Sequence, residues 1–103
     1  MYKDISVLEA VRLTAGDGAV LLDVREPDEW RAVRAPGALH IPMGQLPSSA
    51  DRLPPSGLIA CICHVGGRSA VVAEALVRAG YDAVNVAGGM DAWEAAGLPT
   101  ERG

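Results

Sequence analysis

The sequence predicts an α/β protein with three layers, in which a mostly parallel central sheet carries helices on both faces. Apolar runs at 19–22, 57–61 and 83–86 have the continuous character of strands that are buried on both sides. Segments with helical patterns and helix-capping residues separate these runs. Strands that alternate with helices in this way indicate a parallel sheet.

The first elements are marked by residues that start helices. Ser6 and Glu9 have the spacing of a capping box, which predicts a helix from there through about Leu13. The apolar run 19–22 follows as the first buried strand. Pro27 then suits the first turn of a short helix, where a missing N–H is tolerated.

The middle of the chain is less regular. A brief strand is expected over 39–41, and a helix is expected over 45–52 in spite of Pro47. The strand 57–61 then leads into a tight loop that contains two adjacent glycines, Gly66 and Gly67.

The clearest helix of the chain follows this loop. It runs from Ser69 through Ala79, because Ser69 can cap its start and Gly80 can end it in the left-handed conformation. A buried strand at 83–86 and a final helix at 91–96 complete the predicted elements.

Composition and charge restrict the class of protein. The 103 residues predict one domain over 1–103, and half of them are hydrophobic. Phenylalanine is absent, so the core must come mainly from aliphatic side chains. The formal net charge of −4 argues against a nucleic acid or an anionic membrane as the main partner.

The location and the redox surroundings follow from the N-terminus and the cysteines. The first residues show no secretory signal, and no apolar run reaches the roughly 20 residues that span a bilayer, so we expect a cytoplasmic protein. The two cysteines, Cys61 and Cys63, stand two positions apart on one strand and are poorly placed to bridge each other. Reducing surroundings would keep the thiol of Cys63 free to react.

The loop that begins at Cys63 and reaches Arg68 is the most informative stretch. A thiol at the exit of a strand meets inward-pointing amides of a tight loop and the start of the following helix. Both favour the thiolate, which is the nucleophilic form, so Cys63 is the predicted nucleophile. The glycines supply positive φ and close backbone approach. Cys61, between apolar neighbours, is expected to be a core residue.

The topology gathers the other conspicuous residues beside this loop. Asp23 and Arg25 follow one buried strand, and the stretch 87–89 follows another. Ligands of open parallel sheets lie beyond the carboxyl ends of the strands, where these segments meet. For Asp23 and Arg25 we favour a structural ion pair that braces the loops at this edge.

The length of the loop bears on its chemistry. Four residues separate Cys63 from Arg68, whereas the related loop of cysteine-dependent phosphatases is one residue longer. Those enzymes also tend to have histidine before the cysteine, and here that position is Ile62. The shorter loop has room for a persulfide sulfur but not for a tetrahedral phosphate. It resembles the active-site loop of the rhodanese family of sulfurtransferases.

Further segments of the chain resemble motifs of that family, in the same order. They are Asp23–Glu26, Pro27–Trp30, Pro36–Pro42, Gly88–Trp93 and Gly97–Pro99. One departure is visible, because Val33–Ala35 stands where the family often has Gly-His-Ile. The resemblance implies a rhodanese-like fold and a thiosulfate:acceptor sulfurtransferase.

The resemblance also implies a mechanism and a set of site residues. The Cys63 thiolate takes a sulfane sulfur from a small anionic donor such as thiosulfate and passes it to a thiol, to cyanide or to a protein acceptor. No cofactor and no metal are required. The substrate-binding residues are those that follow the cysteine: His64, Val65, Gly66, Gly67, Arg68 and Ser69.

Alternatives remain open at this stage. One alternative is a persulfide carrier or partner-binding module with little turnover. The other is a phosphatase or arsenate reductase, which the short loop disfavours. Arg68 opens a helix, where the dipole disfavours a cation, which points to an anionic substrate or an acidic partner nearby. His64 is expected to be an exposed loop residue. A metal site of Cys61, Cys63 and His64 would have only three close ligands.

Overall fold

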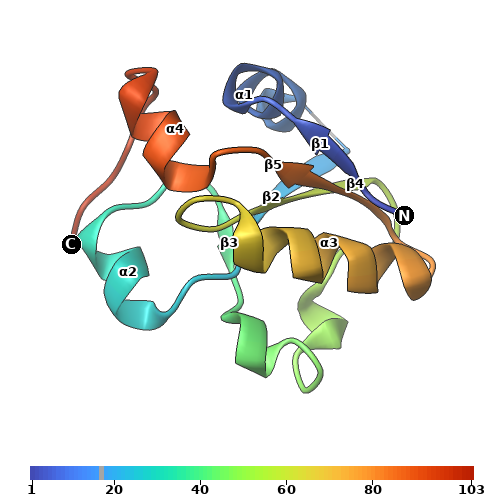
Figure 1. Cartoon of the computed structure of the whole chain (residues 1–103). Helices are drawn as coiled ribbons and strands as arrows, with labels where there is room; N and C mark the ends of the chain where they lie inside the picture. Colours follow the sequence, from blue (N-terminus) through green and yellow to red (C-terminus); the bar gives the residue numbers. More distant parts are fainter. Residues whose placement is uncertain (17) are drawn as a thin grey trace.

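A parallel sheet forms the centre of the computed structural model, which describes residues 1–16 and 18–103. Over these residues the sheet has five strands in the order β1-β5-β4-β2-β3, and every neighbouring pair is parallel (Figure 1). The strands are β1 (Lys3–Ile5), β2 (Ala19–Asp23), β3 (Leu39–His40), β4 (Leu58–Ile62) and β5 (Asp82–Val86). The predicted α/β class is confirmed, although the short edge strand β1 was not expected from the sequence.

Helices cover both faces of the sheet, as predicted (Figure 1). They are α1 (Val7–Ala15), α2 (Pro27–Ala32), α3 (Gly67–Arg78) and α4 (Gly89–Ala95), with 3-10 turns η1 (Met43–Gln45) and η2 (Ala50–Arg52). One hydrophobic core lies between the sheet and the pair α1 and α4. A second core lies between the sheet and α3. None of the described helices is long and apolar enough to cross a membrane.

Strand β4 supplies both cores through the alternation of its side chains. Ala60 and Ile62 belong to the core under α1 and α4, whereas Ile59, Cys61 and Cys63 belong to the core under α3. Cys61 is fully buried, which confirms its expected place in the core. Cys63 therefore lies on the α3 side, directly after the last residue of the strand.

Two local predictions need correction. The helix expected over 45–52 is wrong, because this stretch contains the end of η1 and the separate turn η2. Pro47 lies between them, and proline cannot continue a helical ladder. Ser69 does not cap α3 either. The helix begins two residues earlier, at Gly67, with Gly66 as its N-cap at φ +112°, which leaves the Ser69 hydroxyl free for other partners.

Other local predictions are confirmed. Ser6 caps α1, because its hydroxyl accepts a hydrogen bond from the amide of Glu9, although the return bond of a full capping box is not formed. Pro27 opens α2. Gly80 follows the end of α3 with φ +97°, a conformation that glycine adopts without a steric penalty.

The carboxyl ends of the central strands meet at one edge of the sheet. Asp23 at the end of β2 is paired in register with Ile62 at the end of β4. At this edge the first amides of α4 bind the active-site loop, because Met90 N donates to Cys63 O at 2.7 Å and Asp91 N donates to His64 O at 2.9 Å. This helix start therefore fixes the backbone of the loop.

Gly89 makes that close approach possible. It has φ +56°, and a Cβ atom placed there would collide with the carbonyl oxygens of Cys63 and His64. Any other residue would separate α4 from the loop or strain the backbone of both.

We expect the substitution Gly89→Ala to lower the free energy of unfolding by about 2–4 kcal/mol, through overpacking and a strained φ. Gly44→Ala is the matched control, since no atom lies within 4 Å of the site of its Cβ and its φ is not positive. Urea unfolding of both variants checks the difference. Equal stabilities for the two variants would contradict the role given to Gly89.

Candidate active site

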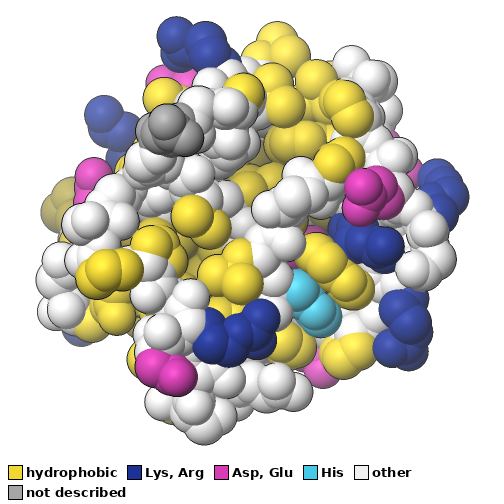
Figure 2. Space-filling model, turned by 180° about the vertical axis from the view of Figure 1, so that it is seen from behind, with side chains coloured by type: hydrophobic (Ala, Val, Ile, Leu, Met, Phe, Trp, Pro, Cys, Tyr) yellow, Lys and Arg dark blue, Asp and Glu magenta, His cyan; other side chains and the backbone are white. Residues whose placement is uncertain are grey.

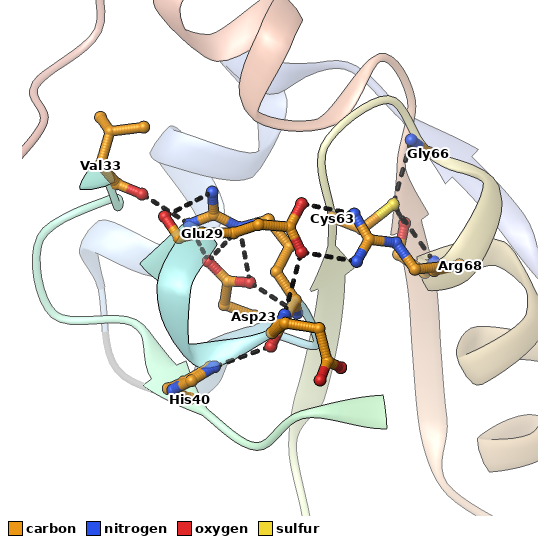
Figure 3. Close-up of polar contacts among 10 residues, drawn as sticks. Asp23, Glu29, Val33, His40, Cys63, Gly66 and Arg68 are labelled. Carbon is orange, nitrogen blue, oxygen red and sulfur yellow. Dashed lines mark hydrogen bonds and ion pairs between the residues drawn. The ribbon is translucent and has the colours of Figure 1, made fainter. Parts of the chain in front are cut away.

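The sulfur of Cys63 lies in a concave loop whose donors point at it (Figure 3). Gly66 N lies 3.1 Å from Sγ, Ser69 N lies 3.4 Å from it, and the Ser69 hydroxyl lies 3.2 Å from it. The positive φ of Gly66 turns its amide inward. Cys63 is only 1% exposed, so the sulfur lies at the bottom of the loop.

These donors change the acidity of the thiol. Burial by itself raises the pKa of Cys63, but hydrogen bonds from the Ser69 side chain and from the amides of Ser69, Gly66 and Arg68 outweigh it, so that the pKa lies below its ordinary value. Burial, with the neighbouring Cys63 charge, raises the pKa of Cys61 to about 12. Of the two thiols, Cys63 is therefore the one suited to form a thiolate.

The remaining loop residues contribute unequally. His64 and Val65 are exposed, Val65 at 62%, as expected for His64. Gly67 opens α3 without a positive φ and has open space around it, so the positive φ expected of both glycines is correct for Gly66 and wrong for Gly67. The donors to sulfur thus come from the second half of the loop and from the first turn of α3.

Arg68 has an acidic partner on another element. Its Nη1 and Nη2 donate to the two carboxylate oxygens of Glu29 at 2.7 and 2.8 Å, which joins α3 to α2 (Figure 3). This bidentate hydrogen bonding lowers the pKa of Glu29 to about 2. Of the two partners that the sequence suggests for Arg68, the acidic side chain is the one present, and binding of an anionic substrate by Arg68 stays a prediction.

Asp23 and Arg25 form a buried ion pair with exposures of 0% and 3%. Arg25 Nη2 lies 2.7 Å from Asp23 Oδ2 and Nε lies 2.9 Å from Oδ1. The same guanidinium donates to the carbonyl oxygens of Glu29, within α2, and of Val33, the C-cap of that helix. The pair therefore holds α2 against the sheet.

The backbone of Arg25 is held in turn by an aromatic pair. His40 Nε2 lies 2.8 Å from Arg25 O (Figure 3). The His40 ring stacks on Trp30 of α2, with ring centroids 4.5 Å apart and planes within 4°. Both residues thus support the position of α2.

A cleft of about 170 Å³ lies beside the loop. Its lining comes from α2, the loop and α4, and includes Arg25, Glu29, His64 and Glu94. No group of three or more potential metal ligands occurs among residues 1–16 and 18–103. Both cysteines are free.

The comparisons with known proteins identify the family. The family model for the rhodanese-like domain matches residues 6–96. The chain belongs to the rhodanese-like domain family. A rhodanese-related protein from Thermoplasma volcanium has a crystal structure that superposes with a TM-score of 0.88 and 30% identity, covering 97% of this chain and 98% of that one.

Two relatives of this rhodanese-like domain carry functional names. One, from Coxiella burnetii, is named "Thiosulfate sulfurtransferase GlpE" and is 33% identical over 92% of this chain and 90% of the relative. The other, from Bacillus subtilis, is named "Putative sulfur carrier protein YrkF" and is 39% identical over 71% of this chain. The match covers 40% of that relative's length, so YrkF is the longer protein.

Glu29 and Asn85, which bind Arg68 and Ser69, were not assigned to the site from the sequence, and neither was Asp4, which binds Asn85. Glu29 was seen only as part of a short helix, although acidic residues near a helix start are common and carry no specific signal. Asn85 accepts from Ser69 and is a polar residue inside an apolar strand. That irregularity is the one signal that could have identified it.

The ion pair between Glu29 and Arg68 should make stability depend on pH. The pKa of Glu29 is about 2 in the folded protein and 4.5 ordinarily, so the contribution of the carboxylate is complete above pH 4.5 and is lost as pH falls towards 2. Since the two side chains are 27% and 38% exposed, we expect Glu29→Gln to lower the free energy of unfolding by about 1 kcal/mol at pH 7.

Denaturant unfolding of Glu29→Gln and of the wild type from pH 7 down to pH 3 checks this prediction. The gap between the two proteins should narrow below about pH 5. Glu9→Gln is the control, because its pair with Arg12 is long, at 3.8 Å, and lies at the surface. Parallel curves for the wild type and Glu29→Gln would contradict the assignment.

Proposed function

We propose that this rhodanese-like domain is a sulfurtransferase that carries a sulfane sulfur as a persulfide on Cys63. The observation that carries the proposal is the set of donors around Sγ, from Gly66 N, Ser69 N and the Ser69 hydroxyl. They favour an anionic sulfur at the end of β4. The relatives named as a sulfurtransferase and as a sulfur carrier support a sulfur-transfer role.

The proposed reaction has two half-reactions. The Cys63 thiolate attacks the outer sulfur of thiosulfate, a bond forms between the two sulfurs, and sulfite leaves with the electron pair of the broken S–S bond. An acceptor nucleophile, which is cyanide or a thiol, then attacks the outer sulfur of the persulfide, and the Cys63 thiolate leaves. Because the acceptor enters after sulfite has left, ping-pong kinetics are expected.

The loop residues have separate roles in this proposal. The amides of Gly66 and Ser69 stabilise the negative sulfur, as donors do in an oxyanion hole. Arg68 adds positive charge near the anionic donor while Glu29 holds its side chain. Asp23 and Arg25 support the loop through α2. Because Cys63 is 1% exposed, a small donor such as thiosulfate fits the site better than a bulky one.

The partners and location follow from the same chemistry. A free thiol at Cys63 requires reducing surroundings, which supports the predicted cytoplasmic location. Charged side chains of both signs lie mainly around the edge of the face shown in Figure 2, while hydrophobic side chains gather towards its middle. That face offers no continuous basic surface for a nucleic acid or an anionic membrane.

A persulfide carrier with little turnover is the second candidate function. The relative named as a sulfur carrier favours it. A carrier would load sulfur from a donor yet release it slowly to cyanide and small thiols, and quickly to a protein acceptor. Turnover with cyanide therefore distinguishes an enzyme from a carrier, since both form the persulfide.

Thiosulfate treatment should add one sulfur atom to the wild type and to Cys61→Ala, and none to Cys63→Ser. The reason is that only Cys63 has donors that stabilise a thiolate, whereas the pKa of Cys61 is about 12. Intact mass spectrometry under non-reducing conditions is the measurement. Sulfur loading by Cys63→Ser would refute the assignment of the nucleophile.

The length of the loop should decide between sulfur and phosphorus chemistry. The unmodified protein should show no hydrolysis of aryl phosphates. One glycine inserted between Gly66 and Gly67 should reduce sulfur loading by at least about tenfold, because it separates the amide donors from one another. Phosphate release and persulfide mass are the two measurements. Strong phosphatase activity of the wild type, or undiminished loading after the insertion, would contradict the proposal.

A further inference from the structure

A chain of buried side chains leads from Cys63 to the edge strand β1. The Ser69 hydroxyl lies 3.2 Å from Cys63 Sγ and 2.6 Å from Asn85 Oδ1. Asn85 Nδ2 lies 3.0 Å from Asp4 Oδ1. Asp4 and Asn85 are register partners on the neighbouring strands β1 and β5. Ser69 and Asn85 are 0% and 4% exposed, so water has little access to their contact.

Asp4, at the end of this series of hydrogen bonds, determines which group donates and which accepts at each step. A carboxylate only accepts hydrogen bonds, so the NH₂ group of Asn85 faces Asp4. The amide oxygen of Asn85 therefore faces Ser69, and it can only accept. The hydroxyl of Ser69 has a single proton, which it cannot donate to Asn85 and to Cys63 at the same time.

The two protonation states of Cys63 make opposite demands on that proton. In the thiol, S–H donates to the Ser69 oxygen, and Ser69 donates to Asn85, so every group is paired. In the thiolate, Sγ accepts the Ser69 hydroxyl proton in addition to the amides of Gly66 and Ser69, and the buried Asn85 oxygen then loses its donor, which carries a cost. Among the described residues, Ser69 is the only side chain that donates to this oxygen.

We propose that Asn85, oriented by Asp4, competes with Cys63 for the single proton of Ser69 and so limits the fraction of thiolate. Asn85 is thereby a positioning residue that acts on the nucleophile through Ser69. The inference rests on the proposed function, in which the Cys63 thiolate is the attacking group. In this proposal Asn85 opposes ionisation of the Cys63 thiol, whereas the loop amides favour it.

Other ionisable groups surround the loop and stay unchanged in the test. From the loop, α2, α3, α4 and the end of β2 these are His64, Glu29, Arg68, Asp91, Glu94, Asp23 and Arg25, and Cys61 is alanine in every variant of the test. Of the charged groups, Asp4 alone forms a hydrogen bond with Asn85 in the described part of the chain. A substitution of Asn85 therefore reports on the Ser69 proton and not on these charges.

The test measures the pKa of Cys63 from the rate of iodoacetamide alkylation against pH, in the Cys61→Ala background. Asn85→Leu keeps the size of the side chain and removes the acceptor, so the pKa should fall by about one pH unit. Ser69→Ala removes a donor, so the pKa should rise. In the Ser69→Ala background, Asn85→Leu should change nothing further, because Asn85 acts through Ser69.

Asp4→Ala provides a second route, since Asp4 is exposed and its loss should not disturb folding. Without the carboxylate the Asn85 amide is free to turn its NH₂ group towards Ser69, so the pKa of Cys63 should again fall, by less than in Asn85→Leu. An unchanged or raised pKa in Asn85→Leu or, if that variant does not fold, in Asp4→Ala would overturn the proposal.

A shift that persists without Ser69 would overturn it as well, because Asn85 would then act by another route. Alkylation requires no sulfur donor, so these outcomes do not depend on whether thiosulfate loads Cys63. Failure of sulfur loading would refute the proposed function and leave the pKa measurements interpretable.

Discussion

The buried ion pair of Asp23 and Arg25 is the contact on which the position of the active-site loop depends. The guanidinium of Arg25 donates to the carboxylate of Asp23 and to the carbonyl oxygens of Glu29 and Val33. Helix α2 then presents Glu29 to Arg68. Because a buried charge without its partner is strongly destabilising, replacing either residue alone by a neutral one should destabilise the fold. The conformation of the loop thus depends on a pair of charges at the end of a different strand, β2 (Figure 3).

The loop is held from a second side by the start of α4. Two amides of that helix bind the carbonyl oxygens of Cys63 and His64, and Gly89 leaves room for the approach. With its carbonyls turned towards α4, the loop directs amides of Gly66 and Ser69 at the sulfur. An anion site of this kind needs no metal and no nearby lysine, because backbone dipoles supply the positive potential. The same arrangement suits a thiolate and a persulfide.

Several features could be predicted from local sequence. Continuous apolar runs predicted the buried strands, and Gly80 predicted the end of α3, since both signals depend only on neighbouring residues. The helix expected over 45–52 was wrong because the proline at position 47 breaks it into short turns. Strand β1 escaped prediction because three residues at an edge carry too short a pattern. Cys63 was recognisable from its place between a strand and a glycine loop.

The sequence by itself determined the fold class, the candidate nucleophile and the length of its loop, because each depends on residues close together along the chain. Only the tertiary structure decided the partners of that loop. Glu29 lies 39 positions from Arg68, and Asp4 lies 81 positions from Asn85. The first pair forms when α2 and α3 meet at the sheet edge, and the second forms when β1 and β5 come into register, which no local pattern encodes. The donors to the Cys63 sulfur lie within six positions of it along the chain, whereas the contacts that hold the loop in place come from the assembled sheet edge.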